Sequence, residues 1–106
     1  MQVKLTLRDI DVSKDVQTRV EERVSRLTKY FQKLQELRVV LSIHDKQART
    51  ELIADIEHGP DLVASHTAED FLTSTERACE KMTHQLTKLK DKLSDHTKQE
   101  PLKKLA

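Results

Sequence analysis

Residues 37 to 57 read LRVVLSIHDKQARTELIADIE, and this stretch carries the clearest structural pattern of the chain. Apolar residues recur at every second position, at 37, 39, 41 and 43 and again at 52, 54 and 56. Because successive side chains of a strand point to opposite faces, this spacing predicts two strands, Leu37 to His44 and Glu51 to Glu57. Asp45, Lys46 and Gln47 between them are typical of a turn. The stretch therefore predicts an antiparallel pair of strands.

Two further strands flank this pair. His58-Gly59-Pro60-Asp61 is the strongest turn signal in the chain, and it leads into a weaker fourth strand at Leu62 to Ala68. Near the start of the chain, the segment from Gln2 to Arg8 has Val3, Leu5 and Leu7 on one side and polar residues on the other. That alternation predicts a half-buried first strand.

Two segments have helical periodicity instead. Ser13 can cap a helix in which positions 16, 20, 24, 27, 31 and 34 are apolar, which predicts an amphipathic helix of about five turns. A second stripe runs from Phe71 to Leu93, and either Thr67 or Asp70 could cap it. The pattern fades after Asp95, and Pro101 disfavours continuation.

The predicted element order is β-α-β-β-β-α, a single-domain α+β fold with a four-stranded sheet. Each helix has one apolar stripe, so both helices should cover the same sheet face. A right-handed crossover should place the first two strands parallel, with the last three strands forming an antiparallel meander. We expect one domain over residues 1–96 and a flexible basic C-terminal tail over residues 97–106.

The composition fits one small domain in a reducing compartment. The chain has 106 residues and one Cys, which excludes an intramolecular disulfide. Residues 1 to 7 contain no charged region followed by an apolar run, so no signal peptide is expected. No apolar run is long enough to span a bilayer. We therefore expect a soluble, cytoplasmic protein that does not bind membranes and is monomeric when free.

Charge is separated along the chain although the net charge is only +1. Residues 34 to 70 hold three basic and eight acidic groups. Residues 14 to 33 hold six basic and three acidic groups, and residues 71 to 106 hold eight basic and five acidic groups. Such separation creates a local field that the net charge hides.

On helical wheels the cations gather beside the apolar stripe of each helix, and they lie on the same side of the stripe in both helices. Either basic flank alone would be ordinary for a surface helix, but two flanks over an acidic sheet favour a one-sided positive face. Such a face suits a phosphate backbone, because neutralised phosphates release counterions. The residues predicted to bind RNA are Arg19, Arg23, Arg26, Lys29, Arg77, Lys81, His84, Lys88 and Lys92.

Aromatic residues are few, and the strands carry none. Phe31 and Phe71 fall on the apolar stripes, and only Tyr30 lies toward the basic side. Base stacking on a sheet is therefore disfavoured, and recognition of RNA shape and backbone by helices fits better.

Catalysis has little support in the sequence. No Gly-rich phosphate loop and no closely spaced Cys or His pair is present, so we expect no enzyme activity, no cofactor and no small-molecule substrate. A metal site from His58 and His66 is a weaker alternative to two solvent-exposed strand ends. Cys79 falls on an apolar stripe, which is typical of a buried small side chain.

Several segments resemble short ribosome hibernation-promoting factors and the sister ribosome-associated inhibitor, a family also called sigma-factor modulation proteins. Asp70-Phe71 and the run from Gln85 to Leu93 resemble the last helix of that family, and Leu27 to Phe31 resembles the end of its first helix. Ile10 to Ser13 and Leu62 to Ser65 are similar to family segments as well. The resemblance covers about residues 1 to 96.

The resemblance implies a fold like that of double-stranded-RNA-binding domains. It also implies binding to rRNA of the small ribosomal subunit over the decoding region, where the protein would block mRNA and tRNA sites during starvation or stationary phase. By position, the family's rRNA-facing residues correspond to Arg19, Arg23, Arg26, Lys29, Lys81, His84, Lys88 and Lys92. Leu72 stands where the family leads us to expect an aromatic residue. Glu76 and Glu80 fall on the far side of their helix from its basic stripe.

The tail favours the short promoting factor within this family. It lacks the acidic extension of the inhibitor and is too short for the dimerisation domain of the long form. We expect the protein to promote ribosome dimers, with storage of single ribosomes as the alternative. A function of a different class is also open, namely a regulator that contacts the transcription machinery through Val40, Ile53 and Val63 beside Glu51, Asp55 and Glu57.

Overall fold

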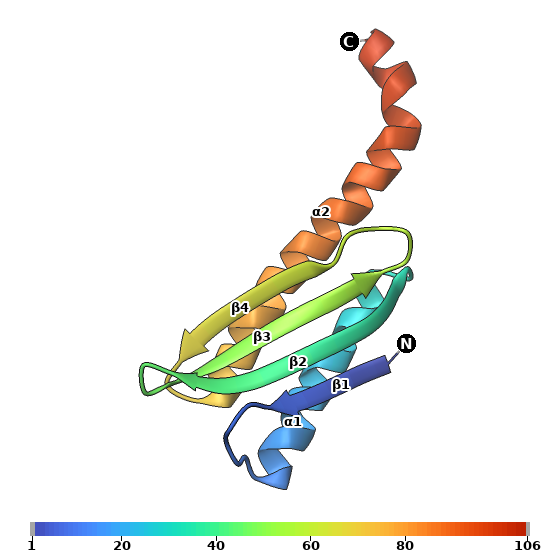
Figure 1. Ribbon diagram of the computed structural model, residues 1–106. Helices are drawn as coiled ribbons and strands as arrows, with labels where there is room; N and C mark the ends of the chain where they lie inside the picture. The colour runs from blue at the N-terminus through green and yellow to red at the C-terminus, as the bar shows by residue number, and fades with distance from the viewer. Residues whose placement is uncertain (1, 106) are drawn as a thin grey trace.

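The computed structural model describes the backbone of residues 2–105 and the side chains of residues 2–29 and 31–91. Four strands form one sheet in the order β1-β2-β3-β4. Their bounds are β1 (Gln2–Leu7), β2 (Leu34–His44), β3 (Gln47–Ile56) and β4 (Leu62–Ala68). β1 runs parallel to β2, and the other neighbours are antiparallel. The α+β fold, the parallel first pair and the antiparallel meander are therefore confirmed (Figure 1).

A tight turn joins β2 to β3. His44 pairs with Gln47, and between them Asp45 and Lys46 have φ angles of 50° and 67°. Positive φ at both central residues is the type I′ geometry, whose twist matches that of the flanking strands. Gln47, expected in the turn, is already the first residue of β3. The resulting hairpin extends to the end of the sheet at which the β1–α1 connection also lies (Figure 1).

The first helix is shorter than its apolar pattern predicts. Ser13 caps it as expected, with its Oγ accepting a hydrogen bond from Val16 N at 3.2 Å. However, α1 (Lys14–Ser25) gives way to a 3-10 helix, η1 (Arg26–Tyr30), and then to extended backbone at Phe31. The five-turn prediction was wrong because a 3-10 turn and the start of a strand also direct apolar side chains inward at similar spacing.

The second helix, α2 (Phe71–Leu105), is longer than predicted. Asp70 rather than Thr67 provides its cap, since Asp70 Oδ1 accepts a hydrogen bond from Thr73 N at 2.7 Å. The backbone stays helical past Asp95 and through Pro101. Proline lacks the backbone N–H that would donate a helical hydrogen bond, but the residues around it are good helix formers. The domain boundary at residue 96 and the flexibility of residues 97–106 stay predictions, because side chains beyond residue 91 lie outside the described part.

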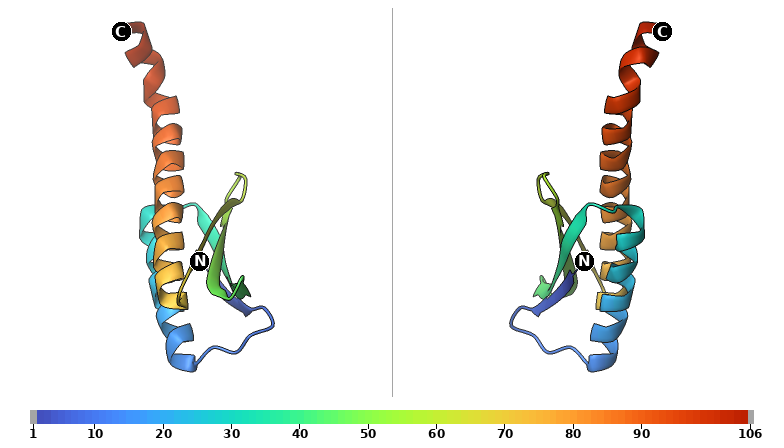
Figure 2. Two further views of the ribbon diagram at one scale, coloured as in Figure 1. Left: turned by 90° about the vertical axis from the view of Figure 1, so that its left-hand side faces the viewer. Right: turned by 90° about the vertical axis from the view of Figure 1, so that its right-hand side faces the viewer.

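Both helices cover the same face of the sheet, as predicted, and they run in the same direction side by side (Figures 1 and 2). The core lies between them and the sheet, with alternate strand residues such as Leu37, Val39 and Leu41 fully buried. Val20 and Val24 of α1 and Met82 and Leu86 of α2 close it from the other side. No helix within the described residues is both long and apolar enough to cross a membrane.

One polar contact lies inside this core. Thr50 of β3 and Ser74 and Thr75 of α2 are buried. The Oγ1 atom of Thr50 lies 2.7 Å from Ser74 Oγ and 3.0 Å from Thr75 Oγ1. Because buried hydroxyl groups are costly unless they are hydrogen-bonded, this contact favours one position of α2 on the sheet.

Candidate nucleic-acid interface

The sides of α1, η1 and α2 that point away from the sheet form one surface, which we call the helical face (Figure 2). These three elements carry all nine residues predicted to bind RNA. Among them, the following side chains are exposed: Arg19, Arg26, Lys29, Arg77, Lys81, His84 and Lys88. Arg23 is half-buried, and the side chain of Lys92, like that of Tyr30, lies outside the described residues.

The direction in which each basic flank points follows from the parallel packing of the helices. The two helices run parallel, and each carries its basic flank on the same side of its apolar stripe. The flank of α1 therefore points toward α2, and the flank of α2 points away from α1. Accordingly, Arg23 of α1 reaches Glu76 of α2, whereas Lys81 of α2 reaches Ser65 of β4. The cations therefore extend from the junction of the helices across α2 to the β4 edge.

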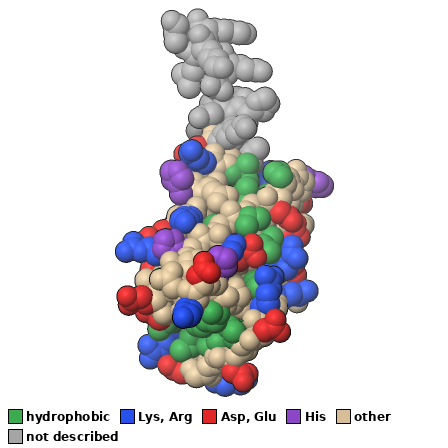
Figure 3. Space-filling model, turned by 60° about the vertical axis from the view of Figure 1, so that its left-hand side comes forward, with side chains coloured by type: hydrophobic (Ala, Val, Ile, Leu, Met, Phe, Trp, Pro, Cys, Tyr) green, Lys and Arg blue, Asp and Glu red, His purple; other side chains and the backbone are tan. Residues whose placement is uncertain are grey.

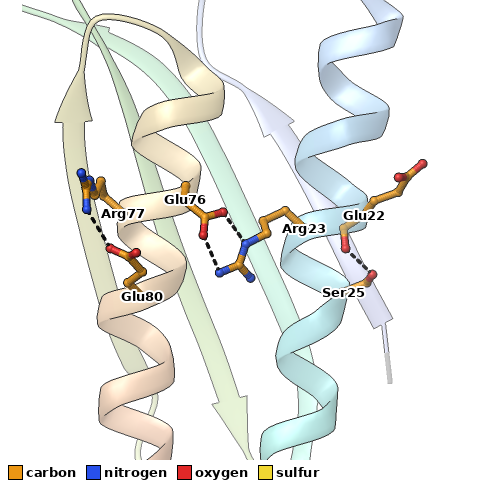
Figure 4. A network of polar contacts seen from close by, with 6 residues as sticks. All are labelled: Glu22, Arg23, Ser25, Glu76, Arg77 and Glu80. Carbon is orange, nitrogen blue, oxygen red and sulfur yellow. Dashed lines mark hydrogen bonds and ion pairs between the residues drawn. The ribbon is translucent and has the colours of Figure 1, made fainter.

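Glu76 lies at this junction, in contact with Arg23. Arg23 Nε donates to Glu76 Oε2, and Arg23 Nη2 donates to Glu76 Oε1 at 3.1 Å (Figure 4). The wheel of α2 alone placed Glu76 and Glu80 away from the basic stripe of that helix. It could not show that this side of α2 packs against the basic flank of α1, so Glu76 belongs to the helical face after all.

The surroundings of Glu76 keep its carboxylate charged. The hydrogen bond from Arg23 lowers the pKa of Glu76, and partial burial opposes this effect. The positive charges of Arg23, Arg26 and Arg77 lower the pKa further. The Glu76 carboxylate thus lies within the influence of arginines from α1, η1 and α2.

Other cations of the helical face have exposed acidic neighbours on their own helix. Arg77 Nη1 lies 3.2 Å from Glu80 Oε1 (Figure 4), and Arg19 Nε lies 3.2 Å from Asp15 Oδ2. Exposed pairs of this kind contribute little to stability, at most about 1 kcal/mol. Such guanidinium groups can therefore exchange a carboxylate for a phosphate at low cost.

Lys81 also has a structural contact that the sequence did not reveal. Its Nζ donates to Ser65 O at 2.9 Å, and Gln85 Nε2 donates to Val63 O at 2.8 Å. Both acceptors are backbone carbonyls of β4, the last strand of the sheet. Side chains of α2 therefore cover the outer edge of β4, which would otherwise present free acceptors to another strand.

The residues considered for chemistry do not gather in one place. Within the described part of the chain, no three His, Cys, Asp or Glu side chains are grouped so that they could hold a metal ion. At the end of the sheet, His58 Nε2 lies 3.6 Å from Glu57 Oε1. Cys79 is fully buried, and burial raises the pKa of its thiol to about 11, so this thiol stays protonated at neutral pH.

The open side of the sheet is less apolar than the sequence suggested. Val63 is 51% exposed and pairs with Ile53. Val40, however, pairs with Glu51, and Arg38 is the other neighbour of Ile53. Arg38 also forms ion pairs with Glu36 and Asp61. Charged residues thus interrupt the expected apolar patch.

Comparisons with known proteins agree with this architecture. The family described as sigma 54 modulation protein / S30EA ribosomal protein matches residues 3–94. The ribosome hibernation promoting factor of Azotobacter vinelandii is 27% identical over 92 residues, covering 87% of this chain and 85% of the relative. The factor of the same name from Escherichia coli K12 is 27% identical over 96 residues, covering 91% of this chain and all of the relative.

Two solved structures share the fold. The Protein Y N-terminal domain of Thermus thermophilus superposes with a TM-score of 0.72 at 26% identity, covering 84% of this chain and 99% of that domain. A ribosomal subunit interface protein from Coxiella burnetii superposes with a TM-score of 0.75, covering 86% and 99%. Its sequence identity is 16%, so this second likeness shows the fold alone.

Proposed function

This chain belongs to the sigma 54 modulation / S30EA ribosomal protein family, and on that premise we propose that it is a ribosome hibernation factor. It binds rRNA of the small ribosomal subunit through the helical face and stops translation without catalysing a reaction. It acts in the cytoplasm, uses no cofactor and is monomeric when free. The names of its relatives, which are ribosome hibernation promoting factors, support this proposal.

The observation that carries the proposal is that most exposed cations of the described residues lie on α1, η1 and α2, although Lys4 and Arg38 are exposed on the sheet. Arg26, Arg77 and Lys88 are exposed on elements that pack against a single face of the sheet, while residues 34 to 70, which include β2, β3 and β4, are acidic. A phosphate backbone is attracted by these cations, whereas the strands bring no comparable excess of positive charge. Several Lys and Arg contacts to phosphates give useful affinity without reading the base sequence.

The aromatic residues support backbone recognition rather than base stacking. Phe31 is 6% exposed and belongs to the core, and Phe71 packs against that core. Neither ring is fully exposed as a platform for an unstacked base. Proteins that recognise folded RNA by shape contact phosphates and sugars along the helix instead, and a rigid pair of helices suits such contacts.

The finer parts of the proposal follow from the family resemblance. The protein occupies the decoding region, so that mRNA and tRNA cannot bind, and it does so in starvation or stationary phase. As the resemblance to the short promoting factors implies, we propose that it promotes ribosome dimers rather than storing single ribosomes.

Sedimentation through a sucrose gradient tests the proposal. In a stationary-phase extract at low salt, the protein should move with small subunits or whole ribosomes, and adding it to purified ribosomes should reduce translation of a reporter mRNA. An increase in the ribosome-dimer peak would support dimer promotion. Protein that stays at the top of the gradient at low salt would refute ribosome binding.

A second candidate function is regulation of the transcription machinery, and the family description includes the words sigma 54 modulation protein. The exposed pair Val63 and Ile53 is the observation that favours it. Changing both residues to Ser should abolish such an activity and leave ribosome binding intact. Ribosome binding lost in that variant, with folding unchanged, would contradict this division between the two faces.

A further inference from the structure

A second surface lies at the end of the molecule where the β2–β3 turn, the β1–α1 connection and the start of α2 meet (Figure 1). A pocket of about 360 Å³ opens there, and its apolar wall includes Ile43, Phe71 and Leu72. Ile43 is 53% exposed and Leu72 is 38% exposed. Of the three large apolar residues that are exposed in the described part of the chain, two therefore line this one pocket.

Most charged groups that line the pocket are acidic. Asp11, Glu69 and Asp70 lie around it, against the single cation Lys46. The carboxylate of Asp70 is held in place, because it accepts hydrogen bonds from both the backbone and the hydroxyl of Thr73. Figure 3 shows a group of hydrophobic side chains at the lower end of the view with charged side chains around it. This end of the molecule thus differs in charge from the helical face.

The geometry points to a docking site for a basic peptide segment that carries one large apolar side chain. The apolar side chain enters between Ile43 and Leu72, and flanking Lys or Arg groups of the peptide face Asp11 and Glu69. Burial of one such side chain contributes about 1.5–3 kcal/mol, and neighbouring charges of opposite sign select basic partners over acidic ones. The site is separate from the helical face, so RNA and a basic protein segment can be held together.

Other occupants fit this pocket less well. A phosphate backbone would meet three carboxylates and one ammonium group. The end of the same chain is not the occupant, because α2 begins beside the pocket and runs away from it (Figure 1), over a helix length of roughly 50 Å. The end of a second copy has suitable chemistry, since Lys103 and Lys104 lie between Leu102 and Leu105, and it is therefore an occupant that the experiment must separate.

Fluorescence anisotropy with a short labelled peptide, made of lysines around a central phenylalanine, tests the site. The full-length protein should bind this peptide in the micromolar range, and added salt should weaken the binding. Ile43→Ser and Leu72→Ser should each raise Kd about tenfold, as expected for the loss of one apolar contact, and Glu69→Gln should raise it a few-fold. A peptide with serine in place of the phenylalanine should bind at least tenfold more weakly.

Val63→Ser is the matched control, because Val63 is 51% exposed on the open side of the sheet and lies outside the pocket. It should leave Kd within twofold, as should Glu57→Gln at the opposite end of the sheet. Equal loss in Val63→Ser and Ile43→Ser, or equal binding of the serine peptide, would overturn the proposal. Self-association of the protein alone that Ile43→Ser abolishes would overturn it as well, by making a second copy the occupant.

Discussion

Arg23 of α1 and Glu76 of α2 are separated by 53 residues in the sequence, yet two hydrogen bonds join their side chains across the helical face. Arg23 is the more enclosed partner, with 22% of its side chain exposed against 49% for Glu76. The pair connects the two helices on the side that faces away from the core. It therefore helps to hold the exposed cations of both helices in one arrangement.

This contact predicts a measurable coupling between the two residues. A double-mutant cycle of Arg23→Ala and Glu76→Ala should give an interaction energy of about 1 kcal/mol in the free energy of unfolding, as for a well-oriented pair that is partly exposed. Urea denaturation of the four proteins measures this energy. If the effects of the two single changes on the free energy of unfolding add up to that of the double change, the side chains do not interact in solution.

The lowered pKa of Glu76 predicts acid sensitivity. Because the folded-state pKa lies below the usual value of 4.5, the carboxylate stabilises the fold fully above pH 4.5, and this contribution is lost as the pH falls through the lowered value. Glu76→Gln should therefore lose less stability than wild type between pH 6 and pH 3. Glu21→Gln, which removes an exposed carboxylate of α1, is the matched control. If the stability of Glu76→Gln depended on pH in the same way as that of the wild type, Glu76 would not have the lowered pKa.

The buried hydroxyl contact predicts that Thr50→Val destabilises the protein although it adds no volume to the core. Thr75 would lose the hydrogen-bond partner that Thr50 provides, and leaving a buried polar group unsatisfied costs about 1–3 kcal/mol. Thr6→Val on the exposed side of β1 should change the free energy of unfolding by less than about 0.5 kcal/mol. Chemical denaturation compares the two, and equal values would show that the buried contact is unimportant.

Burial of Cys79 predicts that its thiol reports unfolding. With the pKa raised to about 11 and the side chain buried, little thiolate is available, so a thiol reagent should react slowly with the native protein at pH 8. The reaction should accelerate in urea along the unfolding curve measured by circular dichroism. Rapid labelling in the absence of urea would mean that α2 separates readily from the sheet.

The sequence predicted the fold well where a local pattern determines the structure. Alternation identified three strands, and the turn signal before Leu62 led to the fourth. The apolar stripe from Phe71 located α2, while its cap stayed open between Thr67 and Asp70. Periodicity failed at Leu27 and Phe31, because a 3-10 turn and a strand start bury these residues as a helix would. It also failed at the end of α2, where Pro101 does not end the helix.

The candidate site was predictable only in part, for a related reason. Wheels of the separate helices identified the cations, and seven of these have exposed side chains. The partners of Arg23 and Lys81 lie on other elements, Glu76 on α2 and Ser65 on β4. Contacts between elements depend on how the helices pack, which no pattern within one element contains.

Binding of rRNA by the helical face can be tested through the salt dependence of binding to purified small ribosomal subunits, measured for wild type, Lys88→Glu and Lys46→Glu. Lys88 is exposed on the helical face, and Lys46 lies in the β2–β3 turn. With about five to eight phosphate contacts, log affinity against log salt should have a slope of roughly −4 to −6. Lys88→Glu should weaken binding more than Lys46→Glu and flatten the slope, with little change in Tm for either variant because exposed charges contribute little to stability. Equal losses for the two variants, or wild-type affinity that hardly changes with salt, would contradict the claim that the helical face binds rRNA.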